Sequence, residues 1–409
     1  MDSGKSKAKP MKPIYIATFH QSRFGKLMGM TVPQILDAAI QGACRQVSAP
    51  ASALDVASVG AACNLPLNEQ GLLAGLVAMT PGLEGKPIEA VENACASGGQ
   101  AVLSVIQKLQ LGMGDTGIAV GYEKMRDAEG KMDGKLIGKV LGYFSHPAER
   151  QGKVFVFPHL FAEVMRDYMN EYGVTERDLA AIPVQEYANA KFNPCAQMNK
   201  VQITLDQALK IEGINRYVVD GLPLKTYDCS QITDGYASLI LATEEGLVKL
   251  GVPKAECVRI AGWGQATDPI RKAGRDVLRP TGAYRAMRVA YEMAGASPAD
   301  VNVAEVHDCF SVMGALGTEV IGKAEAGRGA QYWVDGKAAP DGECAINTSG
   351  GLIAKGHPIG ATGIAMIGWS ALQLKAKAPA ELQVKNPKLA ATFNIGGPIC
   401  ASVCTVLRG

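Results

Sequence analysis

The stretch VENACASGGQAVLSVIQKL (Val91–Leu109) places a small, glycine-rich turn directly before a long apolar helix. The stretch INTSGGLIAKGHPIGATGIAMIGWSALQL (Ile346–Leu374) has the same plan near the other end of the chain. Upstream of each, the sequence predicts a helix, a short turn and a strand, with the turns at Ser52–Asp55 and Ser297–Asp300. The chain therefore reads as two diverged copies of one α/β unit. A chance likeness is the alternative, because strand, glycine-rich turn and helix often follow one another in α/β proteins.

Length and composition favour a large globular α/β protein. The chain has 409 residues, of which 47% are hydrophobic and 47 are glycines. This is enough apolar material for a large core, which excludes a disordered chain, and glycines suit the tight turns between strands and helices. The formal net charge is only +2, so the sequence predicts neither a nucleic acid nor an anionic membrane as partner.

Apolar spacing predicts where individual elements lie. Residues 31–46 are expected to form a helix, because apolar residues recur at helical spacing after Thr31, a residue type that caps helices. Strands are expected at 13–18, 301–306 and 389–393, and a helix at 284–294.

The middle of the chain differs from the two copies. Nine of the aromatic residues (12 Tyr, 9 Phe and 3 Trp in all) fall between Tyr143 and Phe192, and no strand alternation is evident there. We interpret residues 127–228 as an inserted domain. The first half would then comprise residues 13–126 and 229–273, the second half residues 274–409, and residues 1–12 a flexible tail.

The cysteines favour a reduced, intracellular compartment. None of the 10 cysteines forms a Cys-x-x-Cys pair or lies at metal-ligand spacing from a histidine, so no metal site is predicted. No unbroken apolar run approaches the length of about 18 residues that a transmembrane helix needs. Phosphate-binding loops, dinucleotide fingerprints and Gly-x-Ser-x-Gly turns are also missing.

Cys95 is a candidate nucleophile. It lies in Asn93–Gly99, immediately before a predicted helix. A helix N-terminus lowers the pKa of a thiol and offers N–H groups to an oxyanion. A small cysteine buried at a glycine turn is the competing interpretation.

Two histidines and a second thiol extend this candidate site. His307 follows a predicted buried strand, Cys309 comes two residues later, and His357 precedes a predicted helix. With Cys95 they form a set suited to acyl transfer, in which one thiolate attacks and the imidazoles polarise a carbonyl or move protons. Each of them also has a structural interpretation as a core residue. Asn394 and the glycines after it offer an amide and backbone N–H groups to an oxyanion, or form only a turn.

Three motifs carry a resemblance to a known family. ENACASGG (92–99), NTSGGLIAKGHPIGATG (347–363) and NIGG (394–397) together resemble the thiolase superfamily. The resemblance spans the chain, through HQSRFGK (20–26), GYEKM (121–125) and DGYASLIL (234–241). HDCF at 307–310, where common thiolases have Asn-Glu-Ala-Phe, is similar to the sterol-carrier-protein type of thiolase.

This resemblance implies a fold and ligands. It implies two repeated thiolase half-folds, each with a five-stranded sheet, stacked into a five-layer αβαβα core. The inserted loop domain would bind coenzyme A. Acyl-CoA esters would be substrates, no cofactor would be permanently bound, and the protein would form a homodimer or homotetramer.

The resemblance also implies a role for each site residue. Cys95 would be acylated, and His357 would activate it and line an oxyanion hole with His307. The backbone N–H groups of Cys95 and Gly396 would form a second hole. Cys309 would act as the acid and base, because Asn394 stands where common thiolases have a cysteine. His159 is similar in placement to a loop-domain histidine near pantetheine.

The implied activity is that of a CoA-dependent acyltransferase. It would cleave 3-ketoacyl-CoA by thiolysis, or condense acetyl-CoA in reverse, through an acyl-Cys95 intermediate. One alternative is a decarboxylating ketoacyl synthase, which also combines a cysteine with two histidines. The other, motivated by Asn394, is a thiolase-like protein that binds acyl-CoA or lipid and turns over poorly.

Overall fold

The computed structural model describes residues 11–409, so most of the expected N-terminal tail lies outside the described residues. Ten strands form one mixed sheet in the order β3-β2-β4-β5-β1-β6-β10-β9-β7-β8. The strands are β1 (Ile14–Gln21), β2 (Val56–Gly60), β3 (Ile88–Val91), β4 (Thr116–Glu123), β5 (Gly235–Ala242), β6 (Val258–Thr267), β7 (Val303–Val306), β8 (Ala345–Ile346), β9 (Leu389–Gly396) and β10 (Ala401–Arg408).

The strand order confirms the predicted repeat. From each outer edge inward, the five strands of a half occur in the sequence third, second, fourth, fifth, first. The two halves meet where β1 pairs antiparallel with β6, from Ile14 opposite Ile260 to Ile16 opposite Val258. The two expected five-stranded sheets are thus continuous at one edge.

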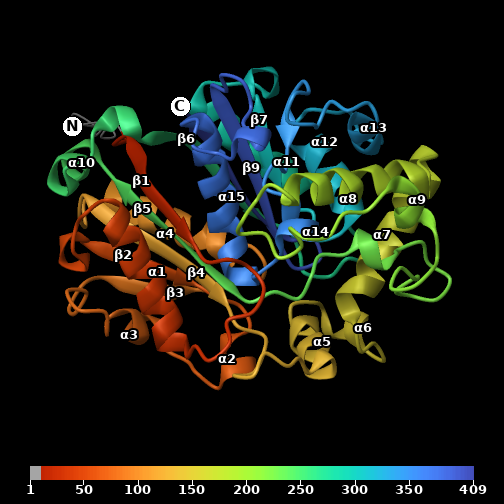
Figure 1. Ribbon diagram of the computed structural model, residues 1–409, viewed down its shortest axis with the longest axis horizontal. Coiled ribbons are helices and arrows are strands. Elements are labelled where there is room, and N and C mark those ends of the chain that lie inside the picture. The colour runs from red at the N-terminus through yellow and green to blue at the C-terminus, as the bar shows by residue number, and fades with distance from the viewer. Residues whose placement is uncertain (1–10) are drawn as a thin grey trace, which may run out of the picture.

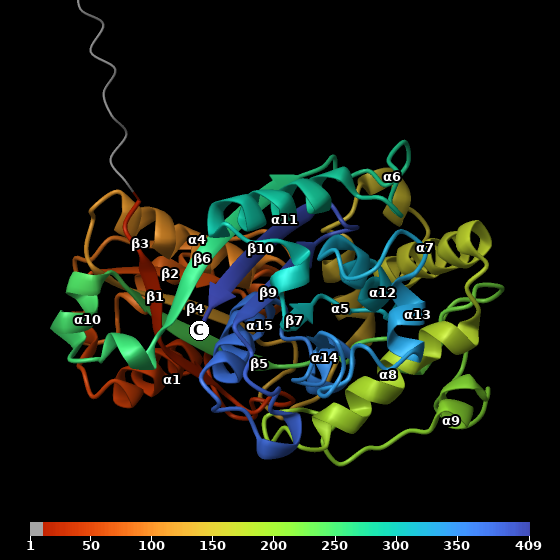
Figure 2. The same cartoon turned by 90° about the horizontal axis from the view of Figure 1, so that it is seen from above.

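Helices cover the sheet in layers (Figures 1 and 2). Helix α4 (Ser97–Gln110) packs against α15 (Ile359–Leu374) between the two halves of the sheet. On the outer faces, α1 (Val32–Gln46) packs against β1 and β5, and α11 (Thr281–Ala294) packs against β6 and β10. Nearly every residue of α15 is buried, which explains why its sequence is apolar on all sides.

The inserted segment is helical (Figure 1), in line with the lack of strand alternation in its sequence. It holds α5 (Gly134–Gly142), α6 (Pro147–Arg150), α7 (Val156–Tyr172), α8 (Glu176–Ala190) and α9 (Leu205–Leu209), and no strand lies within residues 127–228. The remaining helices are α2 (Asn64–Asn68), α3 (Leu73–Val77), α10 (Glu244–Leu250), α12 (Ser311–Val320), α13 (Gly329–Val334) and α14 (Gly351–Lys355).

Some predicted boundaries shift. Strand β1 runs three residues further than expected because Gln21 still pairs with Ala237 of β5. The position of β6 bears on the boundary between the halves. The sequence interpretation assigns residues up to 273 to the first half. In the structure, β6 occupies the same position in the second half as β1 does in the first. The strand order therefore favours a boundary between the halves near residue 257.

Within residues 11–409, no helix is long and apolar enough to cross a membrane.

Candidate active site

The two central helices bring Cys95 and His357 together. Each residue lies two positions before its helix, α4 or α15. The helices touch at their N-terminal ends, where a Cβ on Gly98 would lie 2.5 Å from the carbonyl oxygen of Gly360. Only glycine allows this approach of two backbones. The glycines of both quoted motifs therefore place the nucleophile candidate beside the histidine.

His307 completes a compact cluster with them. The Cys95 sulfur and one ring nitrogen each of His307 and His357 all lie within 4.8 Å of one another. The two imidazole rings are 5.0 Å apart and nearly perpendicular, at 89°. His307 reaches this position because β7 ends at Val306, beside β9. Three residues from both copies of the repeat thus meet at one place.

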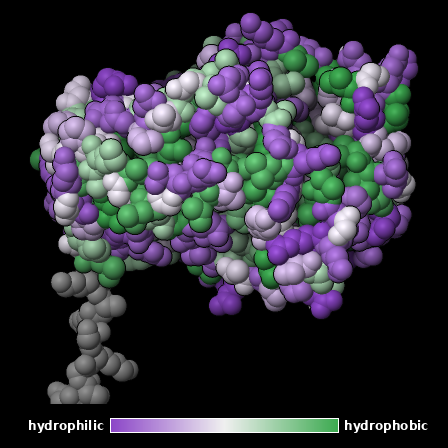
Figure 3. All heavy atoms as spheres, turned by 90° about the horizontal axis from the view of Figure 1, so that it is seen from below, coloured by the Kyte–Doolittle hydropathy of each residue, from purple (hydrophilic) through white to green (hydrophobic). Residues whose placement is uncertain are grey.

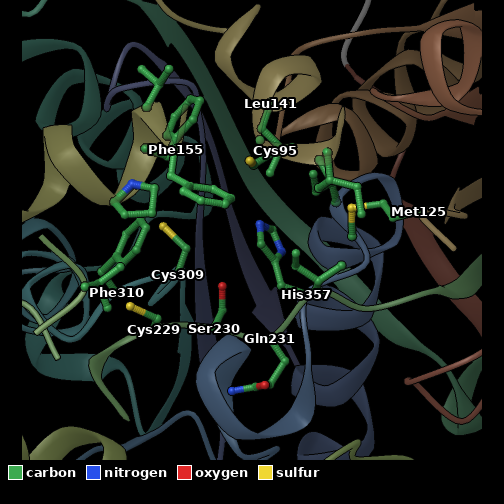
Figure 4. A pocket seen from close by; sticks show the side chains of 18 of the residues that line it. Cys95, Met125, Leu141, Phe155, Cys229, Ser230, Gln231, Cys309, Phe310 and His357 are labelled. Atoms are coloured by element: carbon green, nitrogen blue, oxygen red, sulfur yellow. The ribbon is translucent and has the colours of Figure 1, made fainter. Parts of the chain in front are cut away.

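A cavity of about 370 Å³ opens onto this cluster (Figure 4). The Cys95 and Cys309 sulfurs and the His357 ring are directed into it from different elements. Its walls are largely apolar, and 10 of the 20 lining residues come from the inserted domain. The polar lining residues include Thr226, Ser230 and Gln231. The apolar wall residues include Met125, Ile137, Leu141, Phe144, Phe155, Phe157, Val218, Phe310 and Ile359. The site is therefore a reactive cluster at the end of an apolar cavity.

Hydrogen bonds assign the tautomer of His307. The Asn394 Nδ2 group donates to the carbonyl oxygen of Cys95 at 3.1 Å and to Nδ1 of His307 at 3.0 Å. Since Nδ1 accepts, the proton of the neutral ring is on Nε2. That Nε2 is buried and has no partner within residues 11–409. His307 does not itself line the cavity, but it holds an unpartnered N–H within the cluster.

His357 has the opposite tautomer. Thr362 Oγ1 donates to the carbonyl oxygen of Pro358 at 2.9 Å, so it accepts from His357 Nδ1, 2.7 Å away. With the proton on Nδ1, Nε2 carries a free lone pair. The His357 backbone N–H is fixed by Thr233 Oγ1 at 3.0 Å. His357 is therefore arranged as a base, and His307 as a donor.

These tautomers also bear on metal binding. A cysteine and two histidines at this spacing form a donor set suited to zinc. A metal needs a ring nitrogen with a lone pair, whereas His307 presents Nε2–H and its Nδ1 accepts from Asn394. With these tautomers the cluster does not fit a three-ligand metal site. The sequence prediction of no metal site rested on spacing along the chain and did not anticipate this donor set.

The pKa of Cys95 differs from the sequence expectation. Burial, together with the carboxyl groups of Glu123 and Glu92, raises the pKa of the Cys95 thiol to about 12, against a hydrogen bond from the Gly397 backbone that lowers it. The helix N-terminus alone suggests a lowered pKa, but the loss of hydration dominates here. Ala94, next to the thiol, has φ of 48°, a strained conformation for alanine that fixes the turn.

The other titratable groups of the site are also neutral at rest. Burial lowers the pKa of His357 to about 3 and that of His307 well below its usual value. Burial raises the pKa of Cys309 well above its usual value, so this thiol is protonated. The resting site is thus a neutral thiol beside a neutral base, not a preformed thiolate and imidazolium.

Glu123, at the end of β4, forms hydrogen bonds to both copies of the repeat close to the site. Its carboxyl group accepts backbone N–H groups from Cys63 at 2.9 Å, and from Ala62 and Gly360 at 3.1 Å each. Burial raises the pKa of Glu123 to about 7 against these hydrogen bonds, which lower it. Glu123 therefore changes charge near neutral pH.

This pKa predicts a pH-dependent stability. Because the folded pKa of about 7 exceeds the ordinary 4.5, the contribution of Glu123 is fully present below pH 4.5 and is lost as the pH rises to 7. The loss amounts to about 3 kcal/mol. Thermal unfolding between pH 4.5 and 8 is expected to show a smaller decline in Glu123→Gln than in the wild type, because other buried carboxyl groups with a raised pKa, such as Glu305 and Glu319, remain in both proteins. Parallel curves for the two proteins would contradict it, and Glu381→Gln, at an exposed carboxyl, is the control.

Asn394 is expected to act on the rate through His307. Asn394→Ala removes both hydrogen bonds of Nδ2, so His307 loses its fixed tautomer and kcat should fall roughly ten- to a hundred-fold. Asn394→Asp keeps the shape but cannot donate, and should be impaired at least as much. Steady-state kinetics test this, with KM expected to change little. An unchanged kcat in both variants would exclude this role.

The other residues that the sequence analysis singled out, Asn394, Gly396 and His159, have contacts that differ from those expected. Asn394 is occupied by Cys95 and His307, so its amide orients His307 and is not free for an oxyanion. Gly396 packs against the nucleophile turn, where a Cβ would lie 2.1 Å from Asn93 O. His159 lies in α7, whose first residues line the cavity, but is not itself among the lining residues. Sequence reasoning assigned no role to Thr233, Glu123 and Thr362, although Glu123 lies within the quoted motif GYEKM and Thr362 within NTSGGLIAKGHPIGATG.

Comparisons with known proteins now decide the family. The family model described as "Thiolase, N-terminal domain" matches residues 14–245, and "Thiolase C-terminal domain-like" matches residues 264–409. The chain belongs to the thiolase family. Its relatives include an acetyl-CoA acetyltransferase of Methanothermobacter thermautotrophicus, 34% identical over 95% of this chain and 97% of the relative. Sterol carrier protein 2 of Oryctolagus cuniculus is 30% identical over 97% of this chain and 72% of the relative.

Solved structures confirm the thiolase fold. Human mitochondrial 3-ketoacyl-CoA thiolase in complex with CoA matches with a TM-score of 0.74 at 16% identity, over 97% of this chain and 98% of that one. The predicted recognition, the sterol-carrier relatives and the acyltransferase class are therefore all confirmed.

Proposed function

We propose that this thiolase is a CoA-dependent acyltransferase that cleaves 3-ketoacyl-CoA by thiolysis, or condenses acetyl-CoA in reverse, through acyl-Cys95. The observation that carries the proposal is the convergence of the Cys95 sulfur with one ring nitrogen each of His357 and His307, all within 4.8 Å of one another, in two rings that carry their protons on different nitrogens. Acetyl-CoA acetyltransferases among its relatives support the substrate class.

The first half-reaction begins with a proton transfer. His357 Nε2 takes the Cys95 proton, and the thiolate attacks the keto carbon of the substrate. This transfer leaves the total charge unchanged, which suits a site where burial opposes isolated charges. Protonated His357 then presents an N–H beside that of His307, so both can hold the oxygen of the departing enolate.

Cys309 completes each half-reaction. As the carbon–carbon bond breaks, the enolate carbon takes the Cys309 proton, and acetyl-CoA leaves. The Cys309 thiolate then takes the proton of the incoming CoA thiol, whose sulfur attacks the Cys95 thioester. Acyl-CoA is released, and Cys95 recovers its proton from His357. The neutral Cys309 thiol of the resting site supports the role of acid.

The cavity suits the acyl chain and pantetheine arm of a CoA ester. Its walls are almost wholly apolar, and Ser230 and Gln231 offer polar contacts. We propose that coenzyme A and its esters bind here as substrates, with no cofactor permanently bound. The ten free cysteines support an intracellular, reducing compartment.

A steady-state assay tests the activity. We expect CoA-dependent loss of 3-ketoacyl-CoA, measured over a series of chain lengths and in both directions. Consumption of malonyl thioesters without CoA-dependent cleavage would favour a ketoacyl synthase instead. Tight binding of CoA esters without turnover, unaltered in Cys309→Ala, would favour a binding protein.

We propose a homodimer or homotetramer as the assembly. Strand β3 lies at one end of the sheet, so its outer edge has no partner among the described residues. The segment before it exposes Leu65, Leu72 and Met79, at 66%, 82% and 65%, and hydrophobic residues gather on the lower face (Figure 3). An unpaired edge beside apolar side chains favours association. Light scattering should give the mass of a dimer or tetramer, and a monomer would contradict this.

A further inference from the structure

Two fully buried carboxyl groups meet behind the active site. Asp308 lies between His307 and Cys309, after β7, and Glu186 lies in α8 of the inserted domain. Both are 0% exposed, and neither forms an ion pair among the described residues. Two adjacent carboxylates without a cation would repel each other strongly in such surroundings.

The hydrogen bonds of the two groups are unequal. Asp308 accepts the backbone N–H groups of Leu352 at 2.8 Å and Ile353 at 3.1 Å, and Asn347 Nδ2 at 2.9 Å. Among the described residues, Glu186 accepts only Asn347 Nδ2, at its Oε1, 2.8 Å away, and its buried Oε2 has no donor. A proton on Glu186 would make this carboxyl group a donor, whereas Asp308 already accepts three N–H groups.

The two groups lie on either side of the space beside Gly351, and Asn347 Nδ2 donates to both of them. A Cβ on Gly351 would lie 2.4 Å from Oδ2 of Asp308 and 2.4 Å from Oε1 of Glu186. Gly351 also has φ of 58°, so any side chain there is strained as well as obstructed. The glycine leaves the space in which the two carboxyl groups meet.

We propose that Glu186 and Asp308 share one proton, carried by Glu186, and that this pair is a positioning device for His307 and Cys309. The role in catalysis rests on the proposed thiolase reaction. Burial raises the pKa of both groups, that of Glu186 further, and the hydrogen bond from Glu186 lowers the pKa of Asp308. Asp308 thus holds the negative charge, and the backbone N–H groups of α14 stabilise it.

The pair connects three parts of the molecule to the reacting groups. Asp308 holds the first turn of α14, which leads to His357. Asn347 bonds both carboxyl groups, and its Oδ1 accepts the N–H of Val306, the last residue of β7. Glu186 lies in α8 of the inserted domain and accepts a hydrogen bond from Asn347. The pair therefore holds the inserted domain in position relative to His307, Cys309 and His357.

Four variants test this division of roles. Glu186→Gln keeps a neutral donor, so its kcat and unfolding temperature should be close to wild type. Asp308→Asn removes the charge that accepts the N–H groups, and Glu186→Ala removes the donor; both should lower kcat roughly ten- to a hundred-fold with little change in KM for CoA. Glu319→Gln is the matched control, because Glu319 is a buried carboxyl that accepts backbone N–H groups of Gly327 and Gly329. It should lower stability and leave kcat unchanged.

Two results would overturn the proposal. One is a loss of kcat in Glu186→Gln as large as that in Glu186→Ala, because this would show that Glu186 carries no proton. This comparison can be made even if Asp308→Asn does not fold. The other is an Asp308→Asn protein with a lowered unfolding temperature and a wild-type kcat. A second readout, the alkylation rate of Cys309 by iodoacetamide mapped by mass spectrometry, should change in Asp308→Asn and not in Glu186→Gln. It separates this proposal from the proposed function, because it needs no turnover.

Discussion

Cys95→Ala is expected to lose thiolysis by roughly 10⁴-fold or more, because no other group in the cluster forms a thioester with the acyl chain. Cys95→Ser should be nearly as inactive, since His357 would then have to deprotonate a far weaker acid. The measurement is the rate of CoA-dependent 3-ketoacyl-CoA cleavage. Thermal unfolding serves as the control, and both variants should unfold close to the wild type because Cys95 is partly exposed to the cavity.

Retention of more than a small fraction of the activity in Cys95→Ala would contradict covalent catalysis at this residue. Cys400→Ala is the matched control for losing a thiol near this position. Cys400 lies close enough to influence the Cys95 thiol but does not line the cavity. Its activity should remain close to that of the wild type.

Cys309→Ala is expected to lose thiolysis and condensation by roughly 10²- to 10⁴-fold, because both need a proton moved at the α-carbon. Acylation of Cys95 by acetyl-CoA should persist, since transfer between two sulfurs involves no α-carbon proton. Turnover assays and mass spectrometry of the acylated protein measure the two steps separately. The variant should therefore become acylated but not turn over.

Cys229→Ala is the matched control for this variant. Cys229 lines the same cavity and lies opposite Phe310, the neighbour of Cys309. Its loss should leave turnover close to wild type. Equal damage from the two substitutions, or wild-type turnover in Cys309→Ala, would remove the assigned role of Cys309.

Most of the fold was predictable because it depends on local patterns. Glycine-rich turns before apolar helices predicted the repeat, and the two halves indeed share one strand order. Strand ends were less predictable. Strand β1 continues to Gln21 only because β5 lies alongside it, which is a contact between residues far apart in the chain.

The sequence indicated which residues form the candidate site, but it did not indicate their protonation states. Cys95, His307 and His357 precede or follow the elements whose ends meet, so their convergence follows from the repeat and the motifs. The tautomers depend on which atoms of Asn394 and Thr362 face the rings, and sequence does not encode those contacts locally. The pKa of Cys95 depends on burial and on the carboxyl group of Glu123. Together these outweigh the lowering of the pKa that the helix N-terminus alone suggests.

The most direct measurement is mass spectrometry of the wild-type protein after incubation with acetoacetyl-CoA in the absence of free CoA. The account predicts an added acetyl group on the peptide containing Cys95, removed when CoA is supplied. An unmodified Cys95 peptide with a substrate that the enzyme demonstrably cleaves, or an acyl group on another residue that CoA releases, would contradict it.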